Sequence, residues 1–158
     1  MDTRIVVRPL HAHDVDEVLA LAPRLCEGAA PWRPAEGFLA AAQRWLLEDV
    51  DGASEQTPVW VAERSGRVVG VAAARLQCHF SGPLDCYLGE LVVHPDVEGR
   101  GVGRQLVATV ESWAADRGAA CVTLETGAAN ERARAFYASL GYAEEQVRLT
   151  RVLGQPGP

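Results

Sequence analysis

The chain has 158 residues, of which 48% are hydrophobic and 23% are charged, and its formal net charge at pH 7 is −6. These values are ordinary for a globular protein of one domain, and no apolar run is long enough to span a membrane. All 15 basic residues are arginine, and the acidic balance argues against a nucleic-acid-binding protein, which would show a basic face. The N-terminus has no signal-peptide core, so we expect a cytoplasmic location.

The first half of the chain predicts a strand, two helices and a hairpin. The expected elements are a strand at 5–7, helices at 11–22 and 35–49, and strands at 59–63 and 67–77. Asp14 and Glu17 stand three residues apart near the start of the first helix, a spacing that predicts a capping box. The hairpin follows from two β-branched runs that are separated by a short turn containing glycine.

The second half predicts alternating strands and helices. The expected elements are a strand at 88–93, a helix from the following turn to about 118, a strand at 120–126, a helix from 130 to 141, and a strand at 143–153. The last strand is predicted because apolar and polar residues alternate along it. Residues 154–158 are rich in glycine and proline and predict a frayed tail.

A glycine-rich turn between strand 88–93 and the next helix is the most informative stretch. Gly99, Gly101 and Gly103 lie within five residues and are flanked by Arg100 and Arg104. Glycine permits positive φ and close approach, and a helix N-terminus attracts anions, so this turn suits a pyrophosphate. It is neither a G-x-G-x-x-G fingerprint, because arginine replaces the third glycine, nor a P-loop, because no Gly-Lys-Ser/Thr follows.

Two motifs carry a resemblance to a known family. Residues 93–95 (Val-His-Pro) and 98–103 (Glu-Gly-Arg-Gly-Val-Gly) resemble the acetyl-CoA signature of the GNAT superfamily of N-acetyltransferases. Residues 130–137 (Asn-Glu-Arg-Ala-Arg-Ala-Phe-Tyr), with 140–142 (Leu-Gly-Tyr), are similar to its second motif. The resemblance implies an α/β (α+β) GNAT fold, with a mixed, mostly antiparallel sheet of six to seven strands and about four helices. It also implies a single domain over residues 1–153.

The resemblance further implies that acetyl-CoA binds as cosubstrate. The residues expected to hold it are Leu91, Val92, Val93, Glu98, Gly99, Arg100, Gly101, Val102, Gly103, Arg104, Asn130 and Tyr137. Backbone groups of 91–93 would hold the pantetheine arm, and amides of 99–104 would hold the pyrophosphate. Glu98 departs from the family, which usually has arginine or glutamine there, and its carboxylate would repel a diphosphate unless it points away. No metal is expected, because the four cysteines lack metal-type spacing.

Amide formation from a thioester requires a base for the amine and a proton for the departing thiolate. Glu90 is the candidate base, acting directly or through water, since it is the one acid in an apolar strand, where desolvation would raise its pKa. Pairing with an arginine, or exposure at a strand end, is an equal alternative for Glu90. Tyr137 is the candidate acid, because it matches the tyrosine of the second motif; packing in the core is its alternative.

The acceptor is not encoded in any motif. Trp32, Phe80 and Glu90 are the expected substrate-side residues, whereas Trp45 is interpreted as packing on the sheet. The function predicted is acetyl transfer from acetyl-CoA to the primary amine of a small molecule, with aminoglycoside-like, polyamine and amino-acid acceptors all left open. The alternatives are a protein N-terminal or lysine acetyltransferase and a catalytically weak acyl-CoA-binding module. Because the family often dimerises through its C-terminal strands, a homodimer is a further expectation, with no nucleic-acid or membrane partner.

Overall fold

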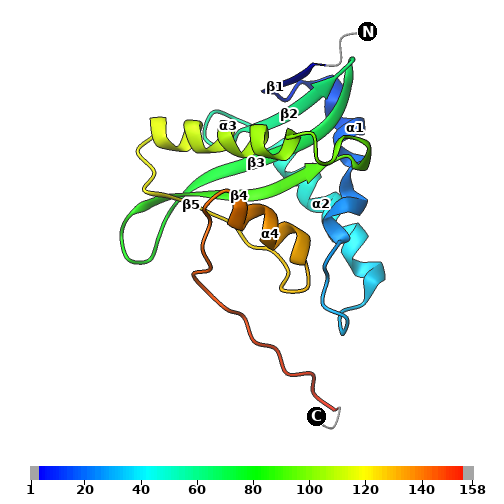
Figure 1. The fold of residues 1–158 in the computed structure, drawn as a ribbon, viewed down its shortest axis with the longest axis vertical. Coiled ribbons are helices and arrows are strands. Elements are labelled where there is room, and N and C mark those ends of the chain that lie inside the picture. The colour runs from blue at the N-terminus through cyan, green and yellow to red at the C-terminus, as the bar shows by residue number, and fades with distance from the viewer. Residues whose placement is uncertain (1–3, 155–158) are drawn as a thin grey trace.

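The computed structural model describes residues 4–154 and shows a twisted sheet with helices on both faces (Figure 1). The strand order is β1-β2-β3-β4-β5; the first four strands are antiparallel neighbours, and β5 is parallel to β4. The strands are β1 (Ile5–Pro9), β2 (Val59–Arg64), β3 (Arg67–Cys78), β4 (Leu84–Val93) and β5 (Cys121–Thr123). The helices are α1 (Val15–Leu19), α2 (Ala35–Asp51), α3 (Val102–Asp116) and α4 (Glu131–Ser139), with 3-10 turns η1 (Ala12–Asp14), η2 (Ala22–Cys26) and η3 (Pro95–Val97).

Alternation along the central strands divides the core into two layers. Trp60 and Ala62 of β2 pack in the layer that contains the buried side chains of α3, with α4 against its margin. Val59 and Val61 of the same strand pack in the layer that contains the buried side chains of α1 and α2. The sheet is therefore apolar on both faces, and each layer is covered by its own helices.

A β-bulge at Gly89 reverses the two sides of β4. Leu88 and Glu90 pair with consecutive residues of β3, so Gly89 is the extra residue between them. Leu88 packs in the α3 layer, whereas Val92, an even number of residues later, packs in the α2 layer. Because side chains alternate along a strand, the bulge also turns Glu90 toward the α2 side.

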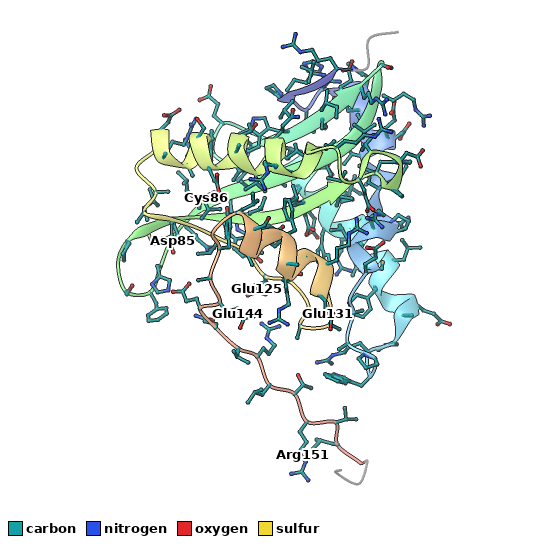
Figure 2. All side chains as sticks on the ribbon, viewed as in Figure 1. Asp85, Cys86, Glu125, Glu131, Glu144 and Arg151 are labelled. Atoms are coloured by element: carbon teal, nitrogen blue, oxygen red, sulfur yellow. The ribbon has the colours of Figure 1, made fainter. Side chains whose placement is uncertain are left out.

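The predicted sheet had six to seven strands, but residues 4–154 form five. Residues 143–153 are not a strand; they run as an extended arm away from the body (Figure 1). Val147, Leu149 and Leu153 on this arm are 77%, 89% and 86% exposed, and Figure 2 shows Arg151 far from the sheet. A strand needs a paired neighbour, and this arm has none among the residues that the structure describes. Strand β5 is also shorter than predicted, and the expected tail beyond residue 154 lies outside the described part.

The helix predicted at 11–22 is broken into η1, α1 and the beginning of η2. The predicted capping box is wrong, because both carboxylates bind other groups. Asp14 accepts hydrogen bonds from Arg8 at 2.7 and 2.9 Å, which lower its pKa to about 2, and from the amide of His11. Glu17 accepts from the amide of Val68 at 2.8 Å. In the part of the chain that the structure describes, no helix has the length and apolar character needed to cross a membrane.

Candidate active site

Strands β4 and β5 separate after three pairs of residues. They pair over residues 85–87 of β4 and the whole of β5. Beyond this point β4 continues to Val93, whereas the chain leaves β5 toward α4 (Figure 1). In the described structure, residues 88–93 therefore have no strand on that side, which leaves an open edge in the middle of the fold.

Part of the backbone of β4 points into this gap. The amide of His94 donates to the carbonyl of Val69 in β3 at 2.8 Å. Backbone groups alternate in direction along an antiparallel strand, so those of Val92 also face β3, while those of Leu91 and Val93 face the gap. The carbonyl of Val93 accepts a hydrogen bond from Nε of Arg24 at 3.3 Å. Two of the three predicted backbone contacts to a pantetheine arm are thus directed toward the gap.

A cavity of about 480 Å³ lies at the gap. Its walls come from η2, the C-terminal half of α2, the middle of the sheet and α4. Glu90 and Tyr137, the predicted base and acid, both line it, as does Asn130. Glu125 lines it from the segment between β5 and α4, where Figure 2 shows it beside α4. The structure thus brings the two predicted catalytic groups to one cavity.

The environment of Glu90 suits a base. Burial raises its pKa from 4.5 to about 7, the charge of Asp49 adds to the rise, and Arg75 opposes it. Within residues 4–154, its carboxylate forms no hydrogen bond or ion pair. Neither alternative, pairing with an arginine or exposure at a strand end, describes this half-buried group. A carboxylate with a pKa near neutrality can accept a proton at physiological pH.

Tyr137 lies on the inner side of α4 between two other rings. Its ring centroid is 5.1 Å from that of Phe136 and 5.5 Å from that of Tyr142. Burial raises the pKa of Tyr137 to about 12, and the charge of Glu90 contributes to the rise. The hydroxyl therefore remains protonated at neutral pH and can act as a donor in the cavity.

The glycine turn before α3 presents a set of backbone donors. In the described structure, five amides there have no acceptor: those of Gly99, Gly101, Val102, Gly103 and Arg104. Gly99 and Gly101 have φ of 69° and 79°, and an added Cβ at either would meet nothing within 4 Å. The amide of Arg100 donates to the carbonyl of Val97 at 3.3 Å. The turn is open to a ligand, and its donors surround a helix N-terminus, which suits a diphosphate.

Glu98 is neutralised by two arginines. Arg24 and Arg132 both form ion pairs with its carboxylate, and the hydrogen bond from Arg132 lowers its pKa. Arg100 and Arg104 are exposed and form no ion pair within residues 4–154. The repulsion expected between Glu98 and a diphosphate is therefore offset, and the turn retains a net positive charge.

The loop after η2 closes one end of the cavity. Asn130 caps α4, as predicted, because its Oδ1 accepts from the amide of Ala133 at 3.1 Å. Its Nδ2 donates to the carbonyl of Glu27 at 3.4 Å. A Cβ added to Gly28, whose φ is 74°, would lie 2.3 Å from the Cβ of Asn130. A glycine is thus required where the two segments cross.

Two predicted substrate-side residues do not line the cavity. Trp32 is 50% exposed and Phe80 is 89% exposed, both on loops outside the cavity wall. Trp45, interpreted as packing on the sheet, lines the cavity together with Glu48 and Asp49. These three stand at positions i, i+3 and i+4 of α2 and so share one face. That spacing was visible in the sequence, but it did not show what the face lies against.

One group of side chains has the composition of a metal site. His11, His13 and Asp14 offer ligand atoms that lie within 4.8 Å of one another. Both oxygens of Asp14 already accept hydrogen bonds from Arg8. The group lies at η1, outside the wall of the cavity, and takes no part in the candidate site.

The proteins that this chain resembles in sequence are acetyltransferases. The sequence profile of the acetyltransferase (GNAT) family matches residues 21–142. An aminoalkylphosphonate N-acetyltransferase of Salmonella typhimurium is 34% identical over 96 residues, which are 59% of this chain and 61% of that protein. An uncharacterised N-acetyltransferase of Methanocaldococcus jannaschii is 32% identical over 109 residues, 66% of this chain and 45% of that protein. The chain thus spans about half the length of these curated relatives.

Solved structures share the fold. An aminoglycoside N-acetyltransferase AAC(6')-Iy in complex with CoA has a TM-score of 0.70 and 21% identity, with 97% of each chain covered. A putative acetyl transferase from Pyrococcus furiosus has a TM-score of 0.76 and 16% identity, with 95% of this chain and 100% of the other covered. The predicted fold class is therefore confirmed, apart from the number of strands.

Proposed function

Because the chain belongs to the acetyltransferase (GNAT) family, we propose that it transfers the acetyl group of acetyl-CoA to the primary amine of a small molecule. One observation carries the proposal. Glu90 and Tyr137 line one cavity at the gap between β4 and β5, and both groups have raised pKa values. Perturbed titratable groups that share a cavity are typical of a catalytic site.

The residues present fit acetyl-CoA as cosubstrate. Five amides without acceptors at the glycine turn suit the pyrophosphate. The backbone groups of Leu91 and Val93 are directed toward the gap and would pair with the pantetheine arm as a neighbouring strand would. An amide at this edge would also donate to the thioester oxygen, where negative charge develops during attack. Arg24 must first release the carbonyl of Val93.

Glu90 acts as the base in this proposal. A free alkylammonium has a pKa near 10, so only about one amine in a thousand is neutral at pH 7. Glu90, with a pKa of about 7, accepts the proton that the nitrogen loses. The nitrogen then forms a bond to the acetyl carbon, and the bond from that carbon to sulfur breaks.

Tyr137 supplies the proton that the departing thiolate requires. Its pKa is raised by burial and by the charge on Glu90. Once Glu90 has accepted a proton, that charge is gone, and Tyr137 becomes a stronger donor. The thiolate gains one proton and the amine loses one, so the transfer is balanced between nitrogen and sulfur.

A small acceptor is favoured over a protein. The cavity of about 480 Å³ is within the usual range for small-molecule sites. The loop at Gly28 crosses the N-terminus of α4, so Glu27 and Asn130 lie side by side in the cavity wall. The Salmonella relative is named for a small aminoalkylphosphonate, and the structural neighbour for aminoglycosides.

The test is a thiol-release assay with acetyl-CoA against a panel of small amines and a panel of peptides. We expect thiol release with at least one small amine. Release with peptides alone would support the protein acetyltransferase alternative. Calorimetric binding of acetyl-CoA without release on either panel would support the acyl-CoA-binding module, and absence of binding would refute all three.

We also propose a homodimer formed by exchange of the C-terminal arms. Residues 143–153 are extended and carry exposed apolar side chains at alternate positions, and within residues 4–154 strand β5 pairs with β4 alone. If the arm of a second copy paired with the outer edge of β5, the backbone hydrogen-bonding groups of both segments would find partners. Sedimentation equilibrium is expected to give a dimer for the full chain and a monomer after removal of residues 143–158. A full-length monomer at high concentration would contradict the exchange.

A further inference from the structure

The walls of the cavity carry more negative charge than the reaction requires. Its charged lining comprises five carboxylates and two guanidinium groups: Glu27, Glu48, Asp49, Glu90, Glu125, Arg24 and Arg75. Arg24 is already paired with Glu27 and Glu98. The remaining part of the cavity is therefore acidic, and one carboxylate is enough for the base.

Asp49 lies opposite Glu90 on the α2 side of the sheet. It is in the last turn of α2, and the bulge at Gly89 turns Glu90 toward the same side. Asp49 also lines a second cavity of about 100 Å³, and Arg75 and Gly89 contribute to both cavities. Asp49 thus contributes to the walls of both cavities.

No cation of the protein pairs with Asp49. Within residues 4–154, the carboxylate forms no hydrogen bond or ion pair. The guanidinium of Arg75 is near enough for its charge to lower the pKa of Asp49, but it stacks over the ring of Tyr87, 4.4 Å from the ring centroid. Asp49 is half-buried, and this burial raises its pKa to about 6. The carboxylate is therefore largely ionised at pH 7. Such a carboxylate is destabilising unless a ligand brings positive charge.

An apolar surface lies beside this carboxylate. Trp45, one turn earlier on the same face of α2, lines the cavity and is 39% exposed. An indole ring can contact methylene groups, and it can also contact a cation through its face. The wall of the cavity therefore carries a base, a second carboxylate and an aromatic ring.

We propose that Asp49 is a specificity-determining residue, which binds a second cationic nitrogen of the acceptor while the reacting amine lies at Glu90. The acceptor is then a diamine or oligoamine, not a simple monoamine. This inference rests on the proposed function, whose substrate class it narrows.

The experiment compares two homologous series of acceptors. The α,ω-diamines from 1,3-diaminopropane to 1,6-diaminohexane are assayed with acetyl-CoA against propylamine to hexylamine. We expect the wild-type protein to prefer at least one diamine over its monoamine partner in kcat/KM. The assays are run at pH 8.5, where Glu90 is ionised with or without the charge of Asp49, which adds to the rise in the pKa of Glu90. There we expect Asp49→Asn to lose about ten- to hundredfold in kcat/KM for that diamine, the range for a charged hydrogen bond, with less than threefold change for the monoamine.

The matched control is Asp51→Asn, which makes the same chemical change two residues later on the same helix. Asp51 is exposed and does not line either cavity. This control is expected to retain the diamine preference. Equal losses for both series in Asp49→Asn, or no diamine preference in the wild type, would overturn the inference.

A binding measurement separates this inference from the proposed reaction. Calorimetry of the preferred-length diamines is performed on the wild-type protein and Asp49→Asn, each saturated with CoA. Weaker diamine binding by the variant supports the inference even if no amine is acetylated, in which case the proposed function alone fails. Absence of diamine binding by the wild-type protein overturns the inference, whether or not other amines react.

Discussion

Replacing Glu90 by glutamine is the most direct test of the proposed base. The substitution keeps the shape of the side chain and removes its proton-accepting oxygen. Below pH 7 the wild-type kcat/KM is expected to fall about tenfold per pH unit, because Glu90 is protonated there. In Glu90→Gln the break near pH 7 should disappear, and kcat/KM should keep rising toward the pKa of the amine, near 10, because only neutral amine can then react. Turnover at pH 7 should fall by about 10²- to 10⁴-fold, the usual contribution of a general base.

The same substitution should stabilise the fold at high pH. The pKa of Glu90 rises from 4.5 to about 7 in the folded protein, so the folded state is penalised once the group ionises. The penalty begins above pH 4.5, is complete above about pH 7, and is at most about 3 kcal/mol at about 1.4 kcal/mol per pH unit. The carboxylate faces a cavity, so solvent screening reduces this to about 1–2 kcal/mol.

Urea unfolding at pH 4.5 and pH 8.5 measures this effect. Glu90→Gln should match the wild type at the lower pH and exceed its stability at the higher pH. Glu55→Gln, in the exposed loop before β2, makes the same chemical change and should show no such difference. An unaltered pH–rate profile together with no gain in stability at pH 8.5 would refute the assignment of Glu90.

Three further substitutions test the rest of the site. Tyr137→Phe should lower kcat by about 10²-fold or more and leave the Kd for CoA within about twofold, as measured by calorimetry; unchanged turnover would remove Tyr137 from the mechanism. Glu98→Gln should tighten CoA binding by about fivefold, because it frees two arginines and removes a negative charge beside the diphosphate; weaker binding would contradict this. Gly28→Ala should lower stability by more than about 1 kcal/mol, because the new Cβ would collide with Asn130. The control Gly66→Ala has the same positive φ and no neighbour within 4 Å, so equal losses in the two would refute the argument from close approach.

The sequence predicted the local parts of this site well. The glycine turn, the cap at Asn130 and the positions of Glu90 and Tyr137 follow from short motifs, whose geometry is set by neighbouring residues. Their meeting in one cavity came from the order of elements that the family resemblance implied. The C-terminal strand was predicted only from the alternation of apolar and polar residues over 143–153. This alternation shows that a segment could pair as a strand, but it does not provide a neighbouring strand.

The contributions of Asp49 and of the bulge were not predictable in the same way. Asp49 stands at the end of an amphipathic helix, where its spacing from Trp45 and Leu46 assigns it to one face, but periodicity does not tell what that face lies against. The alternation along β4 is interrupted at Gly89, so a count from Leu88 places Glu90 on the wrong face. Both features depend on contacts between segments that are distant in the sequence, and a single sequence does not reveal such contacts.

The bulge at Gly89 has a consequence for engineering. The two halves of β4 are out of phase, so deletion of this one glycine would exchange inside for outside along every later position of the strand. Val92 would leave its apolar layer, and the carboxylate of Glu90 would turn toward α3, with no other residue altered. Any graft of this strand into another scaffold must therefore transfer the irregularity together with the side chains.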